Sequence, residues 1–137
     1  MARKMIFLNL PVARLDDAKN FYGALGWTVN PEFTDENAAC VVVDDNICLM
    51  LLAKDFYTTF AERPIADTGT YSAAAYALAL RTREEVDELT EAAIEAGGVE
   101  ESGGQDRRVQ EAEVGMYGRT FLDLDGHQWE PFYMPYQ

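Results

Sequence analysis

The sequence predicts an α+β fold made of two similar βαβββ modules within one domain. Each half begins with an apolar strand followed by an amphipathic helix that ends at a glycine, and each then continues as extended segments joined by short turns. The two helix-ending glycines, Gly26 and Gly97, are about 70 residues apart, which indicates an internal repeat. Because one helix cannot cover both faces of a sheet, we expect the modules to pack together as curved sheets around a cavity.

The first module is predicted to span residues 1–55. The apolar run 5–12 suits a buried strand, and residues 15–25 carry apolar side chains at spacings of three and four, typical of an amphipathic helix capped at Gly26. From Phe33 to Leu52 the chain is predicted to form extended segments with a turn at 44–46. That hairpin would place Cys40 and Cys48 on adjoining strands, where we expect two reduced core cysteines.

The second module is predicted to span residues 72–137, after a connector over 56–71 that has no sustained period and could act as a lid. Residues 73–80 can form a strand, and Thr82 to Glu85 match a capping box that starts a helix ending at Gly97. We expect residues 100–111 to be a polar loop. The segments 116–124 and 127–134 flank Asp125-Gly126, a strong signal for a hairpin.

The amino-acid composition argues against several classes of function. The 137 residues include 24 acidic and 11 basic side chains, a formal net charge of -13 that argues against binding nucleic acid or an anionic membrane surface. Hydrophobic residues make up 48% of the chain, as in folded globular proteins. No apolar run approaches the roughly 20 residues of a membrane span, so a soluble, cytoplasmic protein is expected.

Two stretches carry a resemblance to a known family. "NLPVARLDDAKNFYGALGW" (9–27) and "GRTFLDLDGHQWEPFYM" (118–134) are similar to the first strand and helix, and to the closing hairpin, of the vicinal oxygen chelate superfamily. This superfamily includes glyoxalase I, bleomycin-resistance proteins and extradiol dioxygenases. The resemblance covers essentially the whole chain and implies the paired βαβββ fold. It is also the only reason to expect a homodimer.

Active members of this superfamily hold a divalent metal through side chains on the first and last strands of each half. Carried onto this chain, the histidine positions fall on Phe7 and on Ala75, or Tyr76 if the register slips by one, and the first carboxylate falls near Met50. These side chains are not usual metal ligands. Only Glu130 matches a ligand position, so we predict no metal site and no cofactor, with a divalent metal as the alternative.

The closing hairpin contains two ionisable candidates on opposite faces. By alternation His127 shares a face with Trp129, whereas Glu130 shares the other with Gln128 and Phe132. We interpret His127 as a turn histidine bonded to backbone rather than as a ligand or base. A carboxylate in an apolar pocket must be paired, protonated or ligand-bound, so Glu130 is the candidate catalytic residue, with pairing to Asn9, Arg119 or a tyrosine as the structural alternative.

The candidate binding site is a cavity with polar and aromatic walls. Polar contacts are expected from Asn9 and Gln128, and the residues that could stack on a planar or cationic ligand are Trp27, Phe33, Tyr117, Trp129 and Phe132. The carboxylates of the second helix are expected to form a solvated face rather than a binding site: Glu84, Glu85, Asp87, Glu88 and Glu91.

Three functions remain open at this point. The first is a small-molecule-binding protein without an intact metal site, which sequesters or senses its ligand as a resistance protein does. The second is a metal-dependent lyase, isomerase or dioxygenase of glyoxalase type, with Glu130 as metal ligand or general base. In the third, side chains fill the cavity and the role is purely structural.

Overall fold

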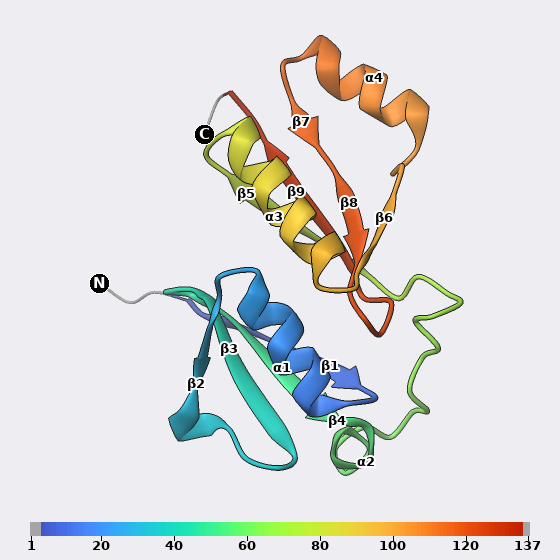
Figure 1. The fold of residues 1–137 in the computed structure, drawn as a ribbon. Helices are drawn as coiled ribbons and strands as arrows, with labels where there is room; N and C mark the ends of the chain where they lie inside the picture. Colours follow the sequence, from blue (N-terminus) through green and yellow to red (C-terminus); the bar gives the residue numbers. More distant parts are fainter. Residues whose placement is uncertain (1–3, 136–137) are drawn as a thin grey trace. The chain divides into compact units, whose positions relative to one another are not determined.

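The structure is a computed structural model that describes residues 4–135. Its contacts divide the chain into two compact units, Met1–Ala66 and Asp67–Gln137 (Figure 1). Each unit contains one sheet and at least one helix packed on it, which confirms the α+β fold class. The first unit follows the predicted βαβββ order, whereas the second contains an additional helix and an additional strand. Among the described residues, no helix combines the length and the apolar character needed to cross a membrane.

The first unit is a four-stranded sheet with the order β1-β4-β3-β2, in which β1 and β4 are parallel and the other pairs antiparallel. Its elements are β1 (Ile6–Val12), α1 (Leu15–Ala24), β2 (Thr28–Asn30), the 3-10 helix η1 (Pro31–Phe33), β3 (Ala38–Asp44), β4 (Ile47–Ala53) and α2 (Lys54–Tyr57). The extended region was predicted to begin at Phe33. In the structure it begins earlier, at β2, and Pro31 starts a helical turn because its fixed φ suits the first helical position.

Helix α1 covers one face of this sheet (Figure 1). The buried strand residues on that face include Leu10, Val12, Leu49 and Leu51, and α1 adds Phe21 and Tyr22. The helix ends where predicted, because Gly26 has a φ of +93°, which L side chains rarely adopt.

The other face of the first sheet carries the alternate residues. Phe7 is opposite Cys48 and Asn9 is opposite Met50 in the register of β1 and β4. The predicted turn joins β3 to β4, so Cys40 and Cys48 lie on adjoining strands as buried free thiols. Burial, and then the nearby Cys48, raise the pKa of the Cys40 thiol.

The second unit has the strand order β5-β9-β8-β6, with β7 also paired to β9. Its elements are β5 (Ala75–Leu80), α3 (Arg83–Glu95), β6 (Val99–Glu101), α4 (Gln105–Glu113), β7 (Tyr117–Gly118), β8 (Thr120–Leu122) and β9 (Gln128–Tyr133). As in the first unit, the first and last strands are parallel neighbours. Thr82 caps α3 as predicted, because its side chain accepts a hydrogen bond from the Glu85 N–H at 3.0 Å.

Alternation along β8 and β9 separates two faces of this sheet. Phe121 and Trp129, which are 0% and 2% exposed, belong to the face that α3 covers. Thr120, Gln128 and Glu130 alternate with them and therefore belong to the opposite face, called the open face here because α3 does not cover it.

The prediction of a loop over residues 100–111 is wrong, because the structure has β6 and then α4 in this stretch. Helix α4 connects the end of β6 to the start of β7 (Figure 1). The prediction failed because α4 has no apolar stripe: Glu111 is its one buried residue, and Val109 is 61% exposed. Ion pairs rather than apolar burial hold this helix, as the site geometry shows.

Candidate functional site

Glu130 lies on the open face of the second sheet and is held by a guanidinium. Arg107 of α4 donates from Nη1 to Oε1 at 3.1 Å and from Nη2 to Oε2 at 3.2 Å, so both carboxylate oxygens are engaged. Gln128 donates to Oε1 at 3.2 Å. The Glu130 side chain is 11% exposed, and such a buried carboxylate needs a compensating partner.

The ion pair extends into a network of alternating charges. Glu111 accepts from Arg107 Nε at 3.0 Å and from Arg108 Nη1 at 2.8 Å, and Arg108 Nη2 donates to Thr120 Oγ1 at 2.6 Å. Two arginines therefore balance Glu111 and Glu130. The hydrogen bonds to Glu130 are the main cause that raises the pKa of Arg107 above its ordinary value, so its guanidinium stays charged.

Two glycines make room for Arg108. A Cβ on Gly118 would lie 2.8 Å from Arg108 Nη1, and one on Gly103 would collide with Arg108 Nη2 and lie 2.8 Å from Thr120 Oγ1. Gly103 also has a φ of +70°, so an L side chain is disfavoured there on two counts. The local sequence is therefore suited to seating Arg108 against β8.

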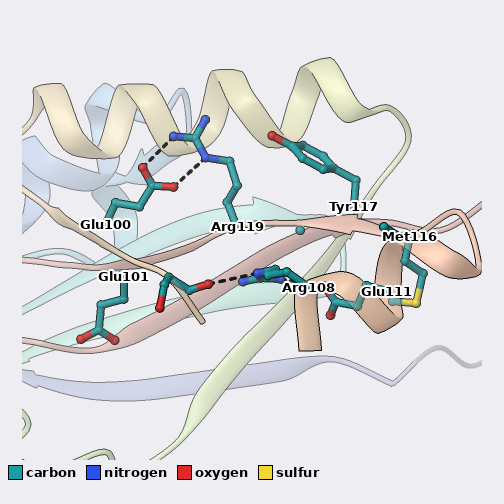
Figure 2. A pocket seen from close by; sticks show the side chains of 10 residues that line it. Glu100, Glu101, Arg108, Glu111, Met116, Tyr117 and Arg119 are labelled. Carbon is teal, nitrogen blue, oxygen red and sulfur yellow. Dashed lines mark hydrogen bonds and ion pairs between the residues drawn. The ribbon is translucent and has the colours of Figure 1, made fainter. Parts of the chain in front are cut away.

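A pocket of about 620 Å³ is lined by residues of β6, α4 and β7 and by their neighbours in the chain (Figure 2). Its lining includes carboxylates, guanidiniums and a few apolar groups: Glu100, Glu101, Arg108, Glu111, Met116 and Tyr117, with Arg119. Figure 2 shows the Arg119 guanidinium bound to Glu100 through two hydrogen bonds, each 2.8 Å long. Within the lining, Arg119 therefore pairs with Glu100 and Arg108 pairs with Glu111.

Arg119 gathers three carboxylates on the α3 side of the sheet. Besides Glu100, it donates to Asp87 at 3.1 Å and to Glu91 at 2.7 Å. The hydrogen bond from the Tyr117 hydroxyl, at 2.5 Å, is the main cause that lowers the pKa of Asp87, and Arg119 lowers it further. Arg119 also lowers the pKa of Glu100. Asp87 and Glu91 were predicted to belong to a solvated face, and their side chains are 49% and 65% exposed, but both also bind Arg119.

The predicted site residues of the second unit fall on both faces of its sheet. Gln128, Glu130 and Phe132 share the open face. Tyr117 lies on the opposite face, paired with Tyr133 and bonded to Asp87, so the structure does not bring it to Glu130. Glu130 is bound by Arg107, whereas Arg119, one of the partners considered from the sequence, belongs to the other cluster.

The other predicted binding residues lie in the first unit. Asn9 is exposed on β1. Trp27 stacks on Tyr22, with ring centroids 5.7 Å apart and planes inclined by 8°. Phe33 is 62% exposed in η1. Trp27 is therefore engaged by the end of α1, while Asn9 and Phe33 have surface accessible to solvent.

His127 is buried and closes the hairpin through its backbone. Its N–H donates to Asp123 Oδ1 at 2.8 Å, and its carbonyl accepts from the Asp123 N–H at 2.9 Å. Trp129, which follows it on the α3 face, contacts Tyr76 with ring centroids 5.2 Å apart.

The positions that would bind a metal in the related enzymes do not fit a divalent ion here. Phe7, Met50 and Ala75 offer no hard donor atom, and both oxygens of Glu130 already accept from Arg107. Within residues 4–135, no group of three or more His, Cys, Asp or Glu residues is placed to hold a metal ion.

Sequence reasoning missed Arg107, Arg108 and Glu111. Their spacing contained a usable signal, because Arg107 and Glu111 are four residues apart and Arg108 and Glu111 three, the separations at which helical side chains meet. Two glycines before them and no apolar period favoured a loop prediction, and without a helix those spacings carried no meaning.

Comparisons with known proteins agree with this fold. Residues 4–44 match the family model described as "Bleomycin resistance protein-like N-terminal". A hypothetical protein from S. aureus has a similar structure, with a TM-score of 0.74 and 26% identity over 97% of this chain and 94% of that one. A comparison with curated proteins found no match.

Two further solved structures share the fold at lower identity. A glyoxalase/bleomycin resistance protein/dioxygenase family enzyme from Burkholderia phytofirmans has a TM-score of 0.74 and 16% identity, over 96% of this chain and 99% of that one. The fosfomycin resistance protein FosX from Listeria monocytogenes has a TM-score of 0.67 and 18% identity, over 99% and 97%. The protein therefore has the glyoxalase/bleomycin-resistance fold.

Proposed function

We propose that this protein binds a small molecule without a divalent metal at the position its enzymatic relatives use, and that it sequesters its ligand in the manner of a resistance protein. The observation that carries the proposal is the two-point ion pair between Arg107 and Glu130. Glu130 is the one residue that matches a ligand position, and a guanidinium already satisfies both of its oxygens.

The chemistry of the neighbouring positions supports the same conclusion. A divalent ion at Glu130 would have to displace Arg107 and then find further ligands, but Phe7, Met50 and Ala75 provide none. Bringing a divalent cation close to the Arg107 and Arg108 guanidiniums would also be electrostatically unfavourable. The resistance-type role is supported by the match to the bleomycin-resistance-like family model and by the similarity to a fosfomycin resistance protein.

The test is elemental analysis of protein purified without chelator and again after incubation with zinc, nickel, manganese or iron(II). We expect no near-stoichiometric metal in the wild type or in Glu130→Ala. The same metal-free protein should bind members of a small-molecule library, detected as a saturable shift in the melting temperature.

The alternative function, a glyoxalase-type lyase, isomerase or dioxygenase, predicts the opposite result. Near-stoichiometric metal that is lost in Glu130→Ala but retained in Glu32→Ala, an exposed carboxylate of the first unit, would overturn the proposal. Arg107→Ala adds a second check. If freeing Glu130 from its guanidinium still gives no bound metal, the neighbouring positions, and not only Arg107, fail to support a metal site.

A further inference from the structure

We infer that the Glu130 carboxylate is a binding site for a planar cation, a guanidinium or amidinium group of the ligand, and that Arg107 occupies this site until such a ligand displaces its side chain. The inference rests on the proposed function and adds the chemical class of the ligand. Arg107 is then a specificity-determining residue that acts as an internal substitute for the ligand.

The geometry of the pair selects a planar, two-point donor. Nη1 and Nη2 of Arg107 approach the two oxygens of Glu130 at nearly equal distances, 3.1 and 3.2 Å. Gln128 fixes the orientation of the carboxylate from the side, and Ser72 lies 3.5 Å from the Gln128 oxygen. Guanidinium and amidinium groups match a carboxylate oriented in this way, whereas an ammonium ion acts as a single point charge.

The burial of the Glu130 carboxylate determines which sign of charge a group must carry to replace Arg107. The Glu130 side chain is 11% exposed, so leaving it charged and unpaired is strongly unfavourable. If Arg107 withdraws, Glu111 keeps its ion pair with Arg108, but Glu130 loses the cation that binds it, and the network loses its balance of charge. A ligand cation restores that balance, but a neutral or anionic ligand does not.

Arg107 can move while the rest of α4 stays in place. Its side chain is 51% exposed, against 22% for Arg108, and it forms ion pairs with Glu111 and Glu130. Arg108 is seated between Gly103 and Gly118 and bonds Glu111, Thr120 and the Ser102 carbonyl. Arg108 thus anchors the helix, and withdrawal of the half-exposed Arg107 side chain would break its bonds to Glu111 and Glu130 without unseating Arg108.

The test is binding of benzamidine, a planar amidinium, measured by calorimetry on the metal-free protein. The wild type should bind it weakly because Arg107 competes. Arg107→Ala should bind it about tenfold or more tightly, as expected when a competing charge-assisted contact is removed. Benzamide, the neutral molecule of the same shape, should not bind either form at the same concentrations.

Two variants control for charge and for the carboxylate. Arg63→Ala removes one positive charge from an exposed position in the first unit and should bind benzamidine as the wild type does. Arg107→Ala combined with Glu130→Gln should lose the gained affinity. In the wild type, the Arg107 Nε–H resonance, assigned from its absence in Arg107→Ala, should shift as benzamidine is added.

Three results would overturn the inference: equal affinities of Arg107→Ala and Arg63→Ala, equal binding of benzamide and benzamidine, or unchanged affinity when Glu130 becomes glutamine in the Arg107→Ala background. If any of these occurs while the metal-free wild type still binds other library compounds, the proposed function stands and the ligand class is wrong. Metal that depends on Glu130 would instead overturn the proposed function itself.

Discussion

Arg119 shows how much a single side chain can organise in this protein. Its guanidinium holds Glu100 through two hydrogen bonds and reaches Asp87 and Glu91 on α3. The Arg119 side chain is 17% exposed, whereas its partners are 37–65% exposed, so solvent screens each pair in part. The contribution of the cluster comes from one cation serving three carboxylates that would otherwise repel one another.

We therefore expect Arg119→Ala to lower the free energy of unfolding by about 1–3 kcal/mol at pH 7, measured by urea denaturation. The pKa values of Asp87 and Glu100 are lowered in the folded state, so their contribution is present above their unfolded pKa values and is lost as the pH falls through the folded ones. The difference between wild type and variant should shrink between about pH 5 and pH 3.

The matched control is Arg119→Lys, which keeps the charge but not the two-point bond to Glu100 and should lose an intermediate amount of stability. A difference between wild type and Arg119→Ala that is the same at pH 7 and pH 3 would show that packing, and not the ionised carboxylates, is responsible.

At the same scale, sequence reasoning found the acidic half of the candidate site and missed the basic half. Glu130 was identifiable because the "DGHQWEPF" stretch fixes its strand and therefore its face. Arg107 could not be identified in this way, because it meets Glu130 only through the position of α4 at the open face. No local sequence pattern specifies that position.

Among the elements, α3 was the easiest to predict because its start and end are both chemically marked. The Thr82 side chain accepts from the Glu85 N–H, and Glu85 accepts from the Arg81 N–H at 3.2 Å. Gly97, with a φ of +108°, ends the helix. By contrast, α4 has neither a side-chain cap nor an apolar face, so its sequence contains no start signal and no hydrophobic period that would predict a helix.

The cap of α3 makes a prediction at this scale. Thr82→Ala should lower the free energy of unfolding by about 1 kcal/mol, because the Glu85 N–H loses its acceptor. Chemical denaturation measures the change. Thr82→Ser keeps the hydroxyl and should stay within a few tenths of a kcal/mol of the wild type; if it is as destabilised as Thr82→Ala, the methyl group and not the cap is what matters.

For the whole molecule, the internal repeat could be predicted from the sequence, and the net charge affects the stability of the fold. Both units begin with a strand and a glycine-ended helix, as the sequence indicated, and both pair their first and last strands in parallel, although the second unit also contains α4. A net charge of -13 means that the folded chain carries substantial self-repulsion.

We accordingly expect the melting temperature to rise by a few degrees when NaCl increases from about 0.01 M to about 0.15 M, because the screening length falls from roughly 30 Å to roughly 8 Å. Scanning calorimetry measures the change, and sodium sulfate at matched ionic strength separates screening from specific ion effects. A melting temperature that falls with salt would mean that attractive ion pairs outweigh the repulsion.

The strand order also determines when each sheet can be completed. In both units the last strand lies between the first strand and the others, with Ile6 paired to Ile47 and Ala75 paired to Gln128. The first strand therefore has no neighbour in its sheet until a long loop has closed. The chain loses conformational entropy in this closure before the strand forms stabilising contacts. During folding, β4 and β9 are the strands that join the two ends of their units, so a nascent half without its last strand keeps its first strand unpaired.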